Sequence, residues 1–129
     1  MNVKTTAQLV QEAKQRVQNL TVEQVATEIA MGSVTLIDIR EPAERQTGTI
    51  PGAIHAPRGM LEFYADSTSP YHRPEFDPNQ RIILHCASGG RSALAADTLQ
   101  RMGYTHVAHL DGGFKAWEAA GQPVTKPSS

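Results

Sequence analysis

The chain has 129 residues and a formal net charge of −1, from 12 basic and 13 acidic residues. This is the length of one domain, and it is long enough to bury a core without disulfides or a structural metal. With 40% hydrophobic and 19% charged residues, the composition excludes a chain that is disordered throughout. The balanced charge, and the lack of any apolar run near the roughly 20 residues of a membrane span, predict no nucleic-acid or membrane partner.

Cysteine usage narrows the chemistry further. Cys86 is the only cysteine, so an intrachain disulfide and a multi-cysteine zinc site are both excluded. The first residues lack the apolar stretch of a signal peptide, and an unpaired thiol is typical of a reducing compartment. We therefore expect a cytoplasmic protein with no metal and no organic cofactor.

The first half of the chain alternates helical and strand patterns. Leu9, Ala13, Val17 and Leu20 recur at helical spacing and predict a helix over residues 7–20. A capping-box pattern at residues 21–24 starts a second helix, which a glycine at position 32 ends. The remaining elements expected up to residue 56 are a buried strand at 34–39, a helical turn at 41–46 and a short strand at 53–56.

The second half begins irregularly and then alternates again. A short helix is expected near residues 60–64, followed by the loop Asp66–Pro78, whose length makes it a candidate lid over a functional site. The elements expected after it are a strand at 81–85, a helix at 92–102, a strand at 106–110 and a helix at 114–120. Short apolar strands alternating with helices predict an α/β domain with a mostly parallel central sheet.

The stretch around Cys86 carries the chemistry. A buried strand runs into this cysteine, at the strand end where ligands bind in open α/β sheets, and then into a small-residue loop and a helix. Two glycines allow successive N–H groups to converge, while the helix start and an arginine add positive charge. These effects favour a thiolate over the small buried hydrophobe that a lone cysteine more often is. The predicted site comprises Cys86, Ala87, Ser88, Gly89, Gly90, Arg91 and Ser92.

Four motifs, in this order, resemble those of the rhodanese-like domains. They are Asp38–Glu44, Gly48–Ile54, Cys86–Ser92 and Leu110–Trp117, and their spacing makes the match specific over about residues 32–121. The resemblance implies a three-layer α/β fold with helices flanking a mostly parallel central sheet. The expected organisation is an N-terminal helical extension at 1–20, the rhodanese-like domain at 21–123 and a C-terminal tail at 124–129.

The resemblance also implies sulfurtransferase activity. Cys86 would take a sulfane sulfur from thiosulfate, a polysulfide or a persulfide, and pass it from a Cys86 persulfide to cyanide or to a thiol, including a protein thiol. This is covalent ping-pong catalysis, and loop amides would stabilise the anionic sulfur. No histidine base is required if donor and acceptor are anions. The expected assembly is a monomer or a weak homodimer.

Two other functions stay open. Cysteine phosphatases, and arsenate reductases with them, use a loop with five residues between Cys and Arg, whereas only four separate Cys86 from Arg91. Rhodanese-like modules also serve as non-catalytic binding or regulatory domains, often without the cysteine. Ala87 and Ser88 replace the basic residue that often follows the cysteine in thiosulfate-using members, so the mouth is less positive unless Arg58 folds over it.

Outside the loop, the charged residues at the end of the first buried strand are expected to be structural, and the histidines are not expected to bind a metal. Asp38 and Arg40 share a face at a strand end, where they tie the strand to neighbouring loops, and Glu44 can pair with Arg40. His106 and His109 lie three apart on a predicted strand, so they point to opposite faces, which argues against a metal site.

Overall fold

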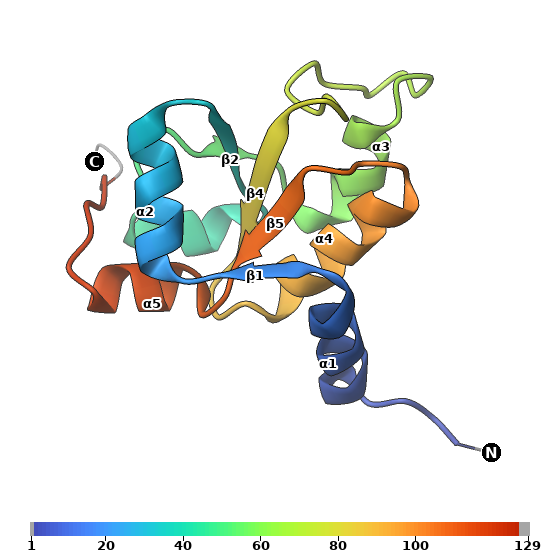
Figure 1. Ribbon diagram of the computed structural model, residues 1–129, viewed down its shortest axis with the longest axis horizontal. Coiled ribbons are helices and arrows are strands. Elements are labelled where there is room, and N and C mark those ends of the chain that lie inside the picture. The colour runs from blue at the N-terminus through green and yellow to red at the C-terminus, as the bar shows by residue number, and fades with distance from the viewer. Residues whose placement is uncertain (1, 127–129) are drawn as a thin grey trace.

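The computed structural model describes residues 2–126 as a parallel sheet between two layers of helices (Figure 1). In space the strands follow the order β1-β5-β4-β2-β3, and every neighbouring pair is parallel. All carboxyl ends therefore meet at one edge of the sheet, which confirms the predicted α/β class. The strands are β1 Gln18–Leu20, β2 Val34–Asp38, β3 Ile54–His55, β4 Arg81–His85 and β5 Val107–Leu110.

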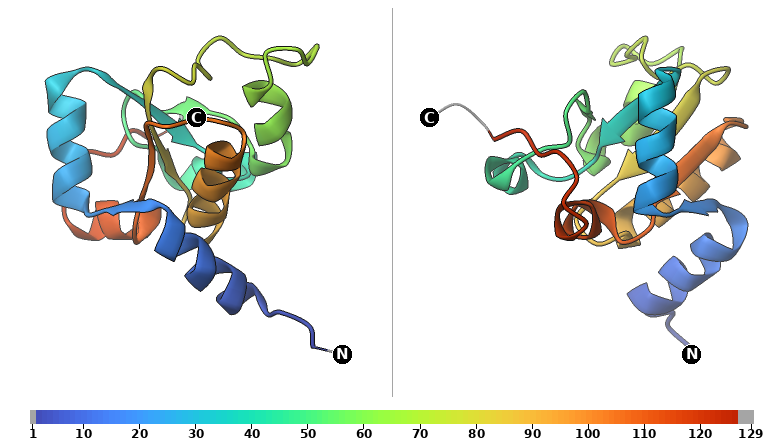
Figure 2. Two further views of the ribbon diagram at one scale, coloured as in Figure 1. Left: turned by 45° about the vertical axis from the view of Figure 1, so that its right-hand side comes forward. Right: turned by 60° about the vertical axis from the view of Figure 1, so that its left-hand side comes forward.

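Helices cover both faces of this sheet. α2 and α5 lie on one face, α3 and α4 on the other, and α1 packs beside α4; Figure 2 shows the layers from two further sides. No helix within residues 2–126 is both long and apolar enough to cross a membrane. The helices are α1 Thr6–Arg16, α2 Val22–Met31, α3 Leu61–Ala65, α4 Gly90–Arg101 and α5 Gly113–Ala119, with the 3-10 helices η1 Pro42–Thr47 and η2 Arg58–Met60.

Alternation along β4 divides its side chains between two cores. Ile82, Leu84 and Cys86 belong to the core under α3 and α4, whereas Ile83 belongs to the core under α2 and α5. His85 also faces the second side, where its ring stacks on Phe114 of α5. Because Cys86 continues the alternation of the strand, its side chain points toward α4.

The N-terminal segment differs from the prediction. The helix expected over residues 7–20 ends at Arg16, and residues 18–20 form β1, an edge strand parallel to β5. Leu9 is exposed, whereas Leu20 is buried in the second core. The four apolar residues therefore do not form one helical stripe, because the last of them belongs to a strand whose partner lies far along the chain. The sheet thus begins inside the expected N-terminal extension.

The C-terminal segment also joins the fold. Thr125 and Thr49 exchange two backbone hydrogen bonds of 2.8 Å, and Val124 packs against the second core. Residues 124–126 of the expected C-terminal tail are therefore attached to the fold. The remainder of that tail, residues 127–129, lies outside the described residues.

Candidate active site

Cys86 lies at the carboxyl edge of the sheet, directly after β4, and is only 1% exposed. The N–H groups of Gly89 and Ser92 donate to its Sγ, with N···S distances of 3.2 and 3.3 Å. The Ser92 hydroxyl lies 3.5 Å from the same sulfur. The sulfur is therefore buried, and the two amide donors that converge on it stabilise negative charge there.

The amide donors come from the start of α4. Ser92 is the third residue of that helix, so its N–H has no partner within the helix and is free for Sγ. Gly89 has φ of +105°, and a Cβ there would lie 3.0 Å from the backbone nitrogen of Gly112, so this position requires glycine. Gly90 has no positive φ, and the nearest atom to an added Cβ is on Val10 at 3.7 Å. Of the two glycines expected to shape the loop, only Gly89 has a special backbone conformation.

The turn between β5 and α5 holds the outer side of the loop. Phe114 N–H donates to the carbonyl of Cys86 at 2.8 Å, and Lys115 N–H donates to that of Ala87 at 3.0 Å. Gly113 has φ of +64°, and a Cβ there would come within 2.6 Å of the Ala87 backbone. These bonds turn two loop carbonyls toward α5. The contact between this turn and the Cys86 loop was not predicted from the sequence.

Arg91 forms an ion pair with a carboxylate. Its two terminal nitrogens donate to the two carboxylate oxygens of Glu44 at 2.7 and 2.8 Å, and this pair ties the start of α4 to η1. These hydrogen bonds from Arg91 lower the pKa of Glu44 to about 2. Within the described residues no hydrogen bond joins the guanidinium to Sγ, so its charge acts on the sulfur only from a distance. The expected pairing of Glu44 with Arg40 is wrong, since Arg40 reaches only the backbone carbonyl of Glu44.

A buried ion pair stabilises the end of β2. Arg40 donates to the Asp38 carboxylate at 2.8 and 3.0 Å, and both residues are at most 2% exposed. The guanidinium also donates to the carbonyl of Gly48 at 2.9 Å and lies 4.3 Å from the ring centroid of Phe114. Although burial opposes it, the bonds from Arg40 lower the pKa of Asp38. The pair thus ties a strand end to the following loop, as predicted.

His85 precedes the catalytic candidate but lies on the other side of the sheet. Its Nε2 is 3.9 Å from the Asp38 carboxylate, and burial lowers the pKa of its imidazole. The ring is therefore neutral and directed away from Sγ. His85 is therefore not placed to act as a base for Cys86.

A chain of hydrogen bonds leads from the sulfur to β1. Ser92 Oγ lies 2.8 Å from Nδ1 of His109, and Nε2 of His109 lies 2.7 Å from Oδ1 of Asn19. Ser92 and His109 are both fully buried. This connection was not predicted from the sequence. The one available signal was a polar residue, His109, within an apolar strand, because a buried imidazole requires a hydrogen-bond partner.

Arg58 does not cover the site. It donates to Glu62 at 2.9 Å and to the Thr98 hydroxyl at 3.4 Å. Thr98 lies in the last turn of α4, far from the start of that helix, where the Cys86 loop is. The prediction that Arg58 folds over the mouth of the site is therefore wrong, because Arg58 instead forms an ion pair with the carboxylate one helical turn away.

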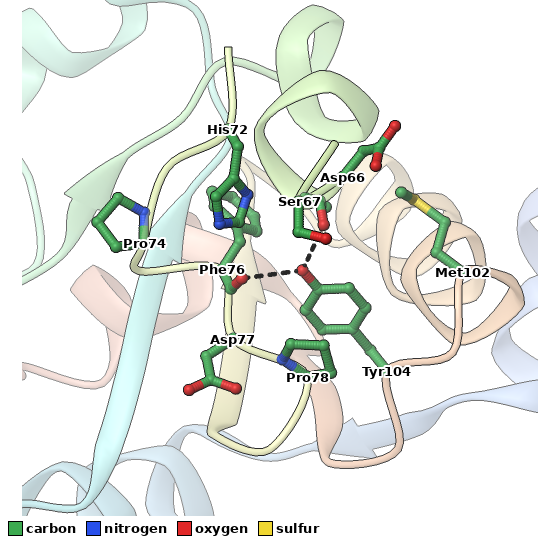
Figure 3. A pocket seen from close by; sticks show the side chains of 10 residues that line it. Asp66, Ser67, His72, Pro74, Phe76, Asp77, Pro78, Met102 and Tyr104 are labelled. Carbon is green, nitrogen blue, oxygen red and sulfur yellow. Dashed lines mark hydrogen bonds between the residues drawn. The ribbon is translucent and has the colours of Figure 1, made fainter. Parts of the chain in front are cut away.

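The loop Asp66–Pro78 lies at the opposite edge of the sheet, before β4 (Figure 1). With the end of α3 and the segment before β5 it lines a cavity of about 450 Å³ (Figure 3). The Tyr104 hydroxyl lies 2.8 and 3.1 Å from the carbonyls of Ala65 and Phe76 there, and burial raises the pKa of Tyr104 to about 12. Since this is the amino edge of the strands, the loop is no lid over Cys86, and that prediction is wrong.

Comparison with known proteins establishes the family. A family model described as the rhodanese-like domain matches residues 21–120. A sulfurtransferase of Allochromatium vinosum is 35% identical over 94 residues, which cover 73% of this chain and 80% of the relative. The chain belongs to the rhodanese-like family, and this relationship supports sulfurtransferase activity in general.

Solved structures agree on the fold. A thiosulfate sulfurtransferase from Pseudomonas aeruginosa is 30% identical with a TM-score of 0.76, over 96% of this chain and 23% of that one. A Rhodopseudomonas palustris protein of unknown function, described as a possible tyrosine phosphatase, is 39% identical with a TM-score of 0.89, over 96% of each chain. These two descriptions differ in chemistry, so the choice between them rests on the Cys86 loop.

Proposed function

We propose that this protein transfers a sulfane sulfur through a persulfide on Cys86. The observation that carries the proposal is the convergence of the Gly89 and Ser92 amides on Sγ, at 3.2 and 3.3 Å. Fixed amide dipoles stabilise an anionic sulfur without placing a counter-ion in the path of a nucleophile. In this mechanism Cys86 is the catalytic residue, and the backbone of residues 87–92 forms the cradle.

The first half-reaction loads the sulfur. The Cys86 thiolate attacks the sulfane sulfur of the donor, a new S–S bond forms, and the donor's own S–S bond breaks. The leaving group departs with the electron pair of that bond, as sulfite if the donor is thiosulfate. The product is Cys86–S–S⁻, whose terminal sulfur carries the charge.

The second half-reaction unloads the sulfur. A thiophilic acceptor, cyanide or a thiolate, attacks the terminal sulfur of the persulfide. The Cys86–sulfur bond breaks and returns its electron pair to Cys86, so the thiolate is regenerated. The two products leave in separate steps, which predicts ping-pong kinetics.

The charge at the mouth favours one class of donor. Ser88 is the exposed residue of the loop, and neither it nor Ala87 carries charge. The two arginines expected to attract a dianion are paired instead, Arg91 with Glu44 and Arg58 with Glu62. We therefore expect persulfides, whose reacting group carries at most one negative charge, to load Cys86 faster than the dianion thiosulfate does.

Phosphate ester hydrolysis is the competing function, because one similar structure is described as a possible tyrosine phosphatase. A phosphatase loop needs an arginine whose guanidinium binds phosphate oxygens. Here both terminal nitrogens of Arg91 are bound to Glu44, and the loop between Cys86 and Arg91 holds four residues. The tighter ring and the committed arginine favour one added sulfur atom over a tetrahedral anion.

Intact mass spectrometry tests the proposal. The protein is exposed to thiosulfate, or to an inorganic polysulfide, and then freed of small molecules. We expect a gain of about 32 Da, one sulfur atom on the thiol, which dithiothreitol reverses. Because Cys86 is the only cysteine, the adduct reports on this residue alone, and Cys86→Ser should abolish it.

Turnover separates the three functions. A sulfurtransferase forms thiocyanate from cyanide and the loaded protein, and Cys86→Ser loses this activity while its thermal unfolding stays cooperative. A binding module would show neither adduct nor turnover. Cys86-dependent hydrolysis of an aryl phosphate without any sulfur adduct would overturn the proposal in favour of a phosphatase.

A further inference from the structure

The hydrogen bonds around His109 determine which of its nitrogens carries the proton. Asn19 donates through Nδ2 to the carbonyls of Lys14 and Val17, at 2.9 and 3.2 Å, so its Oδ1 is the atom that faces the imidazole. An amide oxygen only accepts, and therefore Nε2 of His109 carries the hydrogen and donates to it at 2.7 Å. Burial lowers the pKa of His109 to about 4, which leaves Nδ1 unprotonated near neutral pH.

The direction of the next bonds follows from this tautomer. The bare Nδ1 accepts from the Ser92 hydroxyl at 2.8 Å, so the single Ser92 proton is used. The oxygen of Ser92 then presents only lone pairs to Sγ, 3.5 Å away, and accepts from the Cys86 thiol. The chain therefore points from sulfur to histidine, and each member donates to the next.

We propose that His109 is the base for the Cys86 thiol and acts through Ser92, with Asn19 as the residue that fixes its tautomer. The inference rests on the proposed function in one respect: the relay would activate the thiol for sulfur transfer. Activation of the thiol can nevertheless be measured without a sulfur donor. His109 touches neither sulfur nor substrate in this arrangement. It is a positioning residue whose effect reaches the nucleophile through one hydroxyl.

The proton transfer balances along the chain. As Sγ attacks an electrophile, the thiol proton moves to Ser92 Oγ, and the Ser92 hydroxyl proton moves to Nδ1 of His109. The electron pair of the S–H bond stays on sulfur and forms the new bond. His109 becomes an imidazolium that keeps its Nε2 bond to Asn19, and it later returns the proton to solvent or to the departing group.

Among the residues that the structure describes, no other group near Cys86 is placed for this task. Arg91 is bound to Glu44, and His85 faces the opposite side of the sheet. The charges that act on His109 are Asp111, which favours its protonation, and Lys14, which opposes it. Lys14 and Asp111 also pair with each other at 2.9 Å, so the two charges act on the imidazole together and in opposite directions.

The pH profile of thiol alkylation tests the proposal. Iodoacetamide modifies Cys86, and the rate is measured from pH 5 to pH 10 with no sulfur donor present. A thiol without a base reacts through its thiolate alone, so its rate falls about tenfold for each pH unit below its ionisation. With a neutral histidine as base, we expect a plateau between about pH 5 and pH 7.5.

Three variants sharpen this measurement. His109→Asn keeps an oxygen that can accept from Ser92 but cannot take a proton, and it should remove the plateau. Ser92→Ala removes the connecting hydroxyl and should do the same, with no further effect in the double variant. His106→Asn is the matched control, an exposed histidine beside the same strand, and should keep the plateau.

Nitrogen NMR of the imidazole provides a readout that does not need either variant to fold. When the Cys86 thiol ionises, the Ser92 hydroxyl should turn to donate to the thiolate, so Nδ1 of His109 loses its hydrogen-bond donor and its nitrogen shift should change together with the ionisation of the thiol. This change should be absent in Cys86→Ala. A nitrogen shift that does not follow the thiol, or a wild-type alkylation profile as steep as that of His109→Asn, would overturn the relay. If Cys86 still takes up sulfur in that case, the proposed function holds and only the relay fails. If the plateau is present but Cys86 takes up no sulfur, the relay holds and the proposed function fails.

Discussion

The two edges of the sheet differ in how they use their loops. At the carboxyl edge, the short loop Cys86–Ser92 turns amides toward one buried sulfur. At the amino edge, the longer loop Asp66–Pro78 lines a cavity of about 450 Å³ that contains no cysteine. The comparison shows that the candidate nucleophile lies where hydrogen-bond donors converge and not beside this cavity. A long polar loop resembles a lid in sequence, but the direction of the strands places it at the wrong edge.

Glycine substitutions should separate the two edges most clearly. Gly113→Ala puts a methyl group 2.6 Å from the Ala87 backbone at φ of +64°, so the Cys86 loop must shift. We expect a loss of about 3 kcal/mol in unfolding free energy and a fall of ~100-fold in sulfur transfer. Gly103→Ala, at the amino edge with φ of +101° and open space, should cost about 1 kcal/mol and leave transfer unchanged. Urea unfolding and a thiocyanate assay measure both.

Arginine-to-lysine substitutions give a smaller contrast. Arg91→Lys keeps the charge but loses the two-pronged bond to Glu44 that positions the start of α4. Since a partly exposed pair contributes up to about 1 kcal/mol, sulfur transfer should fall by roughly fivefold at most. Arg81→Lys breaks the equivalent pair with Glu28 at the amino edge and should not alter transfer. Equal losses in the two variants would contradict the assigned role of Arg91.

As the pH falls, the structure at the carboxyl edge of the sheet should lose stability before that at the amino edge. The pKa of His109 is lowered to about 4 in the fold against an ordinary 6.5, so the folded protein binds fewer protons than the unfolded chain between these values. Its stabilising effect is complete above pH 6.5 and is lost as pH falls toward 4, by an amount on the order of 3 kcal/mol. His109→Asn should flatten this part of the pH–stability curve. Hydrogen exchange should accelerate at residues 86–92 earlier than at 66–78.

The smallest effect on sulfur transfer is expected at the amino edge. Tyr104→Phe removes the hydroxyl that lies near the Ala65 and Phe76 carbonyls. Buried carbonyls without partners should lower the unfolding free energy by about 1–3 kcal/mol. Sulfur loading of Cys86, followed by mass spectrometry, should be unchanged. A clear loss of loading would show that the two edges are coupled.

Local patterns in the sequence were sufficient for most elements. The capping box at residues 21–24, the buried strand expected at 34–39 and found at Val34–Asp38, and the strand-to-helix passage through Cys86 all follow from neighbouring residues, and all three were predicted. The chemistry expected of Cys86 rests on the same local features. They are a strand end, a small-residue loop and the free amides of a helix start.

Tertiary structure alone decided what surrounds that cysteine. β1 exists because β5 offers it an edge, and only that pairing brings Asn19 to His109 and, through Ser92, to the sulfur. Likewise Arg91 turned to Glu44 on η1, a partner that the local spacing did not single out. Hydrogen bonds between distant segments leave no periodic pattern in a single sequence. A buried polar side chain requires a hydrogen-bond partner, but the sequence does not show which residue that partner is.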